Sequence, residues 1–295
     1  MLLYLNESIT DLESCLRNGQ CIVGVDKTFN MGKVFVTALN YKNTGLFRAT
    51  TRSNPIFIGP IFIHGTSTKE AFDVFFREIA SLVASSQPIP IGSDGESALV
   101  QSIKNNFPDC IHLKCILHVK ANVEQKLDVK LRVSSSVKRD VTAQLFDPPD
   151  GIVFSGDKET YDARMTSLTS YTERAVPNFL PYVNNRLRES LWDSIVAPRL
   201  KLGLLEPWTN NNAESANNIM KAVTDYRPKK LPELVDKLHQ LVSSQFVDVE
   251  RALYGQGEFR IADLYIRYRI SYDVSEAPQV ALCSHVSALQ KRSLL

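Results

Sequence analysis

The chain has 295 residues, 44% of them hydrophobic, and its 34 basic and 32 acidic residues give a net charge of +2. This composition suits one large domain or two ordinary ones, and it excludes neither a neutral nor a polyanionic partner, so any nucleic-acid surface has to be local. The five cysteines are odd in number and irregularly spaced, which argues against the disulfide framework of a small secreted protein.

The first residues and the apolar runs of the sequence indicate where in the cell the protein is expected. The start, MLLYLNESIT, lacks a basic segment, and its apolar run is too short for a signal peptide. No later run approaches the roughly 18 apolar residues of a membrane span. We therefore expect an intracellular protein with reduced thiols and no membrane partner.

The first part of the chain predicts three strands and a helix. Residues 21–29 (CIVGVDKTF) and 33–42 (KVFVTALNYK) flank the turn-like NMG and are typical of an antiparallel pair, and residues 55–65 (PIFIGPIFIHG) indicate a third strand. Residues 66–83 then predict an amphipathic helix. Ser67, with Glu70 three positions later, matches a capping box at its start.

Strands and helices alternate after this helix. A short strand is expected in residues 89–96 (IPIGSDGE), a helix over 97–107 and a fifth strand over 110–119 (CIHLKCILHV). From residue 120 to 206 the apolar residues fall at helical intervals, with breaks at FDPPDG and VPNFLP. Two further helices follow, in 209–223 and 231–246.

These elements predict an α/β fold with a mixed five-stranded sheet flanked by helices. Residues 1–119 and 207–250 form the two parts of the core, residues 120–206 an all-α insertion, and residues 251–295 a C-terminal extension. No repeat of 20 to 50 residues occurs, so solenoid and propeller folds are excluded.

A carboxylate stands in the first predicted strand, VGVDKTF. Side chains alternate along a strand, so Asp26 shares a face with Gly24, while Val23 and Val25 point to the other side. A buried charge is normally paired, bound to a metal or neutralised by a proton. A strand-end aspartate that only accepts backbone hydrogen bonds is the simpler alternative.

Two further acids follow in the chain. Asp94 comes directly after the fourth strand, at the end where open α/β sheets present ligands, although Asp-Gly is also an ordinary turn or helix N-cap. Glu214 lies in TNNNAESANNIMK, where Asn217, Asn218 and Lys221 follow it at three, four and seven residues and share one polar helix face. A solvated face is the alternative for that helix.

The succession VDKTF, GSDGE, CILH and TNNNAES resembles the Mutator-like element (MULE) transposase domain of the DDE transposases. The resemblance spans residues 20–240, and the four motifs occur in the family order. It implies a ribonuclease H-like core, with the all-α insertion between the fifth strand and the last catalytic helix. Asp26, Asp94 and Glu214 then match the catalytic acids, and Cys115 and His118 match a C-x-x-H motif.

The resemblance implies a nuclear enzyme that cleaves DNA phosphodiesters at transposon ends and transfers the strands to a target. The three acids would hold two Mg²⁺ or Mn²⁺ ions, which stabilise the attacking and leaving oxygens of an in-line displacement. Asn218 and Lys221, beside Glu214, are further candidates for DNA contact. Transposases of this kind act on paired ends, so a homo-oligomer is possible.

The segment CIHLKCILH also contains Cys110 and His112, which suggests a zinc site. If the segment is a strand, Cys115 points away from the three other candidates, which argues against a four-ligand site. Cys115 is then a packed thiol. His118 has two interpretations of equal weight, a contact to DNA phosphate or a ligand, and a structural histidine.

Basic side chains that could bind phosphates cluster in three places. Between Lys120 and Asp140, six basic residues (Lys120, Lys126, Lys130, Arg132, Lys138, Arg139) stand against three acids, a local charge of 6 − 3 = +3. YRPKK at 226–230 and LYIRYRI at 264–270 interleave aromatic and basic residues. Such runs are more often solvated faces than binding sites.

Two further functions stay open. A domesticated, non-catalytic transposase relative would bind DNA or protein, and another ribonuclease H-like nuclease, such as a resolvase or an RNA-cutting enzyme, would use the same acids. Neither an N-terminal DNA-reading domain nor a zinc knuckle is visible, and Cys283 with His285 supplies half a zinc site at most. We therefore expect a truncated copy, an excised core or a transposase-derived host protein.

Overall fold

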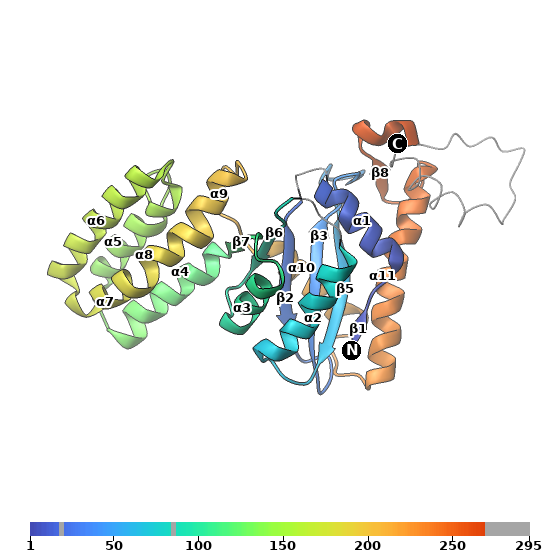
Figure 1. Ribbon diagram of the computed structural model, residues 1–295, viewed down its shortest axis with the longest axis horizontal. Helices are drawn as coiled ribbons and strands as arrows, with labels where there is room; N and C mark the ends of the chain where they lie inside the picture. The colour runs from blue at the N-terminus through green and yellow to red at the C-terminus, as the bar shows by residue number, and fades with distance from the viewer. Residues whose placement is uncertain (18–20, 84–86, 269–295) are drawn as a thin grey trace, which may run out of the picture.

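A mixed six-stranded sheet forms the centre of the computed structural model, which describes residues 1–17, 21–83 and 87–268 (Figure 1). In spatial order the strands are β1 (Leu2–Leu3), β5 (Ile56–His64), β3 (Phe35–Lys42), β2 (Val23–Thr28), β6 (Pro90–Ser93) and β7 (Ile111–Lys114). The pairs from β1 to β2 are antiparallel, whereas β2, β6 and β7 run parallel. The predicted α/β class and mixed sheet are confirmed, with β1 as a sixth strand too short to show a pattern.

The predicted meander of three strands is present. β2 pairs with β3 so that Asp26 lies opposite Ala38, and β3 pairs in turn with β5. Asn30, in the turn between β2 and β3, has a φ of 67°, a left-handed conformation that asparagine tolerates better than most residues. Between β3 and β5, the short β4 (Leu46–Arg48) pairs with β8 (Phe259–Ile261) in a separate two-stranded sheet.

Helices cover both faces of the sheet. The helices α1 (Asn6–Arg17), α2 (Lys69–Leu82) and α3 (Ser97–Asn106) pack with Val23 and Val25 of β2 in one hydrophobic cluster. The helices α10 (Asn211–Val223) and α11 (Leu231–Leu253) pack with the opposite face, which includes Ala38. The alternation predicted for β2 is therefore confirmed, and Asp26 faces α10.

The start of α2 differs from the prediction by one residue. Its N-cap is Thr68, whose hydroxyl accepts a hydrogen bond from the Ala71 N–H at 3.3 Å. The predicted capping role of Ser67 is wrong, because the Ser67 hydroxyl instead bonds to Lys27 and Glu96. The same TST sequence offers neighbouring hydroxyls, so the pattern alone cannot choose between them.

The predicted fifth strand is too long. β7 ends at Lys114, Cys115 is an N-cap residue, and the helix α4 (Ile116–Gln125) follows directly. His118 is therefore helical, and the argument that strand alternation turns Cys115 away from it does not hold. The alternating apolar pattern misled because Val119 and Val123 also fit helical spacing, and both are buried in the helical region.

The helices from α4 to α9 lie to one side of the sheet, green to yellow in Figure 1. They enclose a hydrophobic cluster of their own, which runs from Val119 to Val196 and contains no strand residue. The helical character predicted from residue 120 onward is thus observed. In chain order the elements after α4 are η1 (Lys126–Lys130), α5 (Ser135–Phe146), η2 (Ile152–Phe154), α6 (Lys158–Ala175), η3 (Pro177–Phe179), α7 (Leu180–Tyr182), η4 (Val183–Leu187), α8 (Arg188–Leu191), η5 (Trp192–Val196) and α9 (Ala197–Lys201).

The chain returns from this helical region to the sheet at Trp208. A Cβ atom on Gly92 of β6 would lie 2.3 Å from the Trp208 ring, so the ring rests directly on the β6 backbone. The Trp208 carbonyl accepts a hydrogen bond from the Ile116 N–H at 3.1 Å, which joins the segment that leaves the sheet to the segment that returns to it. This contact brings the start of α10 to the ends of β6 and β7.

The last described element is η6 (Asp263–Tyr268). Cys283, His285 and the end of the LYIRYRI run lie outside the described residues. Within residues 1–17, 21–83 and 87–268, no helix has the length and hydropathy needed to cross a membrane.

Candidate functional site at the carboxyl ends of β2 and β6

Asp26 is held on the α10 face of the sheet by two hydrogen bonds. Its Oδ1 accepts from the Lys27 N–H at 2.9 Å, and its Oδ2 accepts from the Asn217 side-chain amide at 2.9 Å. Asn217 is 9% exposed. The alternative of a solvated helix face therefore does not hold for Asn217, which turns inward between Ala213 and Met220 to meet the carboxylate.

Asp94 lies on the neighbouring parallel strand end. Its Oδ1 accepts from the Glu96 N–H at 2.9 Å, which makes a side-chain turn before α3, and Gly95 supports that turn with a φ of +90°. Asp94 is thus a turn residue, while the helix N-cap is Glu96. The turn role and a role in a site are compatible, because the second carboxylate oxygen of Asp94 has no bond to a described residue.

The charges of the candidate acids act on one another. Burial, and then the carboxylates of Asp94 and Glu214, raise the pKa of Asp26 to about 6, against the opposing effects of the Lys27 amide and His118. No lysine or arginine of the described chain forms an ion pair with Asp26. Asp26, Asp94, Glu214 and His118 therefore share one region, and no ion pair joins any of the three acids to a lysine or arginine of the described chain.

Glu214 is the most open of the three acids. It lies in the first turn of α10, its side chain is exposed, and it makes no hydrogen bond or ion pair with a described residue. Nowhere in the described ranges do three or more His, Cys, Asp or Glu side chains lie close enough to hold a metal ion. The three acids converge electrostatically without forming a closed ligand set.

The donor chemistry nevertheless fits a hydrated divalent cation. Mg²⁺ takes oxygen ligands, keeps several waters and needs only one or two protein carboxylates. Asp26 and Asp94 each carry a fixed oxygen and face the same region, so they could hold such an ion, with Glu214 able to approach because it is unrestrained.

Cys115 and His118 sit at the start of α4. Cys115 is fully buried, and its Sγ accepts from the Asn210 N–H at 3.3 Å, which joins the beginnings of α4 and α10. The side-chain amide of Asn210 is buried without a hydrogen-bond partner, and the same is true of the His118 Nδ1. His118 thus approaches the acids, whereas Cys115 supports the segment behind them.

The two remaining candidates on α10 make no hydrogen bond or ion pair with the acids within the described chain. Asn218 is exposed, and the Lys221 ammonium is 5.6 Å from the centre of the exposed Phe29 ring. Both present polar groups to solvent beside the site.

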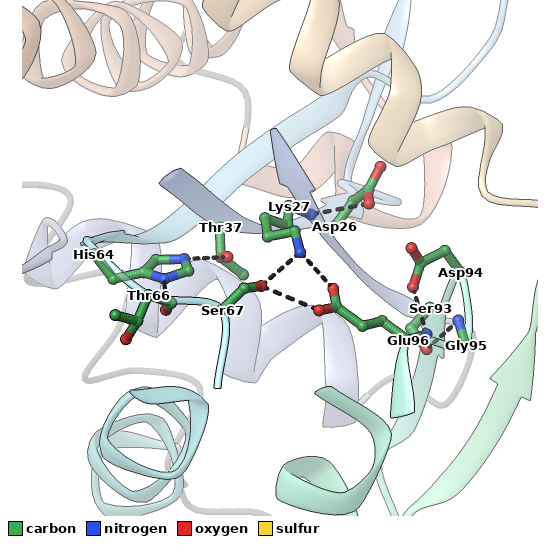
Figure 2. Close-up of polar contacts among 10 residues, drawn as sticks. All are labelled: Asp26, Lys27, Thr37, His64, Thr66, Ser67, Ser93, Asp94, Gly95 and Glu96. Atoms are coloured by element: carbon green, nitrogen blue, oxygen red, sulfur yellow. Dashed lines mark hydrogen bonds and ion pairs between the residues drawn. The ribbon is translucent and has the colours of Figure 1, made fainter. Parts of the chain in front are cut away.

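Several polar residues of this region escaped the sequence analysis. Figure 2 shows Lys27, Ser67 and Glu96 as a bonded group on the sheet face opposite the Asp26 carboxylate. Lys114, at the end of β7, covers Gly95 and lies near Asp94; burial lowers its pKa, and the Asp94 charge opposes that shift. The alternation of β2 could have indicated Lys27, since a lysine beside a buried aspartate needs its own partner.

The arrangement presents uncompensated carboxylates, an unpaired imidazole nitrogen and a nearby lysine at the ends of parallel strands. Carboxylates are ligands that divalent cations prefer, basic side chains bind phosphates, and the strand ends are where open α/β sheets hold ligands. The chain matches no model of a known protein family, and a search of curated proteins finds no match.

Proposed function

We propose that the chain is the catalytic core of a metal-dependent, DDE-type DNA transposase that resembles the Mutator-like elements. The observation that supports it is the raised pKa of Asp26, caused first by burial, then by Asp94 after the adjacent parallel strand and by Glu214 on α10. No ion pair joins Asp26 to a lysine or arginine of the described residues. A binding module has no need of two further acids whose charges act on a buried aspartate.

The sheet is consistent with the ribonuclease H-like core that such an enzyme requires. Three antiparallel strands are followed by two parallel ones, each reached through a helix, and the helical region separates the second acid from the third. The first two acids stand at the ends of the two central parallel strands. This order supports the proposed fold family.

Asp26 and Asp94 are the proposed ligands of Mg²⁺ or Mn²⁺, with Glu214 completing a two-ion site. When bound, the ions supply Lewis-acid stabilisation of both oxygens in an in-line phosphodiester displacement. The protein's part is to orient the acids: Asn217 and the Lys27 amide hold Asp26, and the Glu96 amide holds Asp94. His118 and Lys114 are placed to contact the phosphate.

The proposed partner is DNA, and a nuclear location and a homo-oligomer on paired ends follow from that role. Among the six basic residues of the helical region, Lys138 pairs with Asp128 at 2.5 Å, and Lys126 lies 5.8 Å from the centre of the Tyr182 ring. Lys130, Arg132 and Arg139 are exposed. These three are the best candidates for phosphate contacts in the helical region.

A non-catalytic, transposase-derived binding protein is the second candidate. The exposed carboxylate of Glu214 and the lack of a closed ligand set in the described residues favour it. Such a protein would bind DNA without cutting it, and replacement of Asp26 would leave that binding unchanged.

Nicking of supercoiled plasmid DNA with and without Mg²⁺ or Mn²⁺ tests the proposal. We expect nicking by the wild type, loss of at least about 100-fold in Asp26→Asn and Asp94→Asn, and unchanged nicking in Asp162→Asn, an exposed acid of α6. Equal nicking by Asp26→Asn and the wild type would refute the site. Binding without nicking by the wild type favours the second candidate.

Strand transfer and cleavage of an RNA–DNA hybrid separate the transposase from other nucleases with the same acids. A transposase joins a 3′ hydroxyl end to target DNA, whereas a ribonuclease cuts the RNA strand of the hybrid. Hybrid cleavage without strand transfer would reassign the substrate and leave the acids in place.

A further inference from the structure

The backbone pairing between β2 and β6 ends before the chain reaches Asp26 and Asp94. β2 and β6 pair at Val23 with Ile91 and at Gly24 with Gly92, and these are the last pairs between them in the described chain. Asp26 and Asp94 lie two residues beyond, where no backbone ladder sets the distance between the strand ends. Two carboxylates in that position repel each other.

A polar network spans this opening on the other face of the sheet (Figure 2). The Lys27 ammonium lies 2.7 Å from Glu96 Oε2 and donates to Ser67 Oγ at 2.5 Å, while Ser67 Oγ donates to Glu96 Oε1 at 3.0 Å. The two charged side chains are 21% and 27% exposed, so water screens the pair only in part. Because Ser67 precedes α2, the network ties three chain segments together.

The same two residues hold the two aspartates through their main chain. The Lys27 N–H donates to Asp26 Oδ1 and the Glu96 N–H donates to Asp94 Oδ1, both at 2.9 Å. Each end of the ion pair is therefore one hydrogen bond away from one of the carboxylates. A shift of Lys27 or Glu96 moves the acid that it holds.

The network also determines which acid Lys27 neutralises. Neighbouring residues of a strand point to opposite faces, so the ammonium and the Asp26 carboxylate lie on different sides of β2. Glu96 and the Phe35 ring, whose centre is 5.4 Å from the ammonium, keep it there. If Lys27 were released and paired with Asp26, the site would lose charge that a cation requires.

We propose that the Lys27–Glu96 ion pair, bridged by Ser67, sets the spacing of Asp26 and Asp94 and keeps the lysine away from them. These are positioning residues, and the inference rests on the proposed function, in which Asp26 and Asp94 are metal ligands. It goes beyond that function because it assigns a role to three residues on the face that the metal does not touch.

Titration of the full chain with Mn²⁺, followed by electron paramagnetic resonance of the free ion, tests the proposal. We expect Glu96→Gln and Lys27→Met each to weaken Mn²⁺ binding about tenfold or more, the usual effect of removing an outer partner of metal ligands. The exchanged variant Lys27→Glu/Glu96→Lys restores the ion pair and should recover most of the affinity.

Lys69→Met is the matched control. It removes the Lys69–Asp73 ion pair of α2, which has the same length of 2.7 Å and a similar exposure of 34% and 18%, but touches neither Asp26 nor Asp94. Its Mn²⁺ affinity should stay within about twofold of the wild type, because distant sites act independently.

A purely structural role would lower thermal stability without changing the affinity. Unchanged Mn²⁺ binding in Glu96→Gln and Lys27→Met, with a lower melting temperature, therefore overturns the inference alone. No Mn²⁺ binding by the wild type, or equal binding by Asp26→Asn, overturns the proposed function as well. If Lys27→Met does not fold, Lys27→Arg keeps the charge, and its retained affinity is the result expected of the ion pair.

Discussion

Replacement of Asp26 by Asn should stabilise the metal-free protein. The pKa of Asp26 is raised from 3.8 to about 6, chiefly by burial and then by Asp94, so the folded chain binds a proton there more tightly than the unfolded chain does. The stability from this group is present in full below pH 3.8 and is lost as the pH rises through 6. At about 1.36 kcal/mol for each pKa unit, the loss in the wild type reaches roughly 3 kcal/mol by pH 7.5.

Asparagine carries no charge and avoids this loss, but it also gives up an acceptor. Asp26 accepts from both the Lys27 amide and Asn217, and an Asn side chain has one oxygen for the two donors. A lost hydrogen bond costs about 1 kcal/mol, which leaves a net gain near 2 kcal/mol. For a chain of this size that gain corresponds to a rise in melting temperature of roughly 3 °C.

Thermal unfolding in EDTA from pH 4 to 8, followed by circular dichroism, measures the difference. We expect the advantage of Asp26→Asn to grow between pH 4 and 7 and then to level off. With Mg²⁺ the order should reverse, because only the wild type gains the binding term RT ln(1 + [Mg²⁺]/Kd). A wild type that is more stable than Asp26→Asn in EDTA at pH 8, or a difference independent of pH, would refute the reasoning.

Three further predictions concern other parts of the chain. Asp11→Asn should reduce the fall in melting temperature between pH 5 and 7.5. Burial raises the Asp11 pKa to about 6, so the stability that this group contributes is also lost as the pH rises. An unchanged pH dependence of thermal unfolding would contradict this prediction. Gly92→Ala should lower the free energy of unfolding, measured in urea, by about 2 kcal/mol or more, since the new Cβ would meet the Trp208 ring at 2.3 Å. The loss should be smaller when the same change is made in Trp208→Ala. Equal losses in both backgrounds argue against the contact. The double variant Arg132→Ala/Arg139→Ala should weaken DNA binding and reduce the slope of log K against log salt by about 2. The control Lys158→Ala, which replaces a lysine paired with Asp162, should leave this slope unchanged. A slope that the double variant does not change excludes these phosphate contacts.

The parts of the fold with a strong periodic pattern could be predicted from the sequence. The three antiparallel strands and the amphipathic α2 follow from alternation and from helical spacing, which local sequence records directly. β1 could not be predicted, because two residues carry no period and their place depends on the edge offered by β5. The end of β7 was missed because one alternating run served a strand and then a helix.

The site shows a similar division. Asp26 and Asp94 could be placed because each lies in or directly after a short apolar strand, although β2 and β6 are neighbours in the sheet without being consecutive in the chain. Helical spacing groups Asn217 with Glu214 and Asn218 on one polar face but cannot give its direction, which the packing of α10 on β2 fixes inward to the Asp26 carboxylate. The Lys27–Glu96 pair joins residues 69 positions apart, and no local pattern reports such a contact.

A raised pKa does not by itself separate a working carboxylate from a structural one, and the chain contains both. Asp11 and Asp26 are each shifted to about 6, with burial as the main cause. Asp11, however, accepts hydrogen bonds from the Tyr41 hydroxyl at 2.6 Å and from the Asn43 amide, and these donors belong to the sheet and its loop. No second acid contributes to the shift of Asp11, whereas Asp94 and Glu214 both contribute to that of Asp26. We therefore expect divalent cations to stabilise the protein through Asp26 and to leave the pKa of Asp11 unchanged. A stabilising effect of cations that survives in Asp26→Asn but disappears in Asp11→Asn would show that the cation binds near Asp11 instead of Asp26.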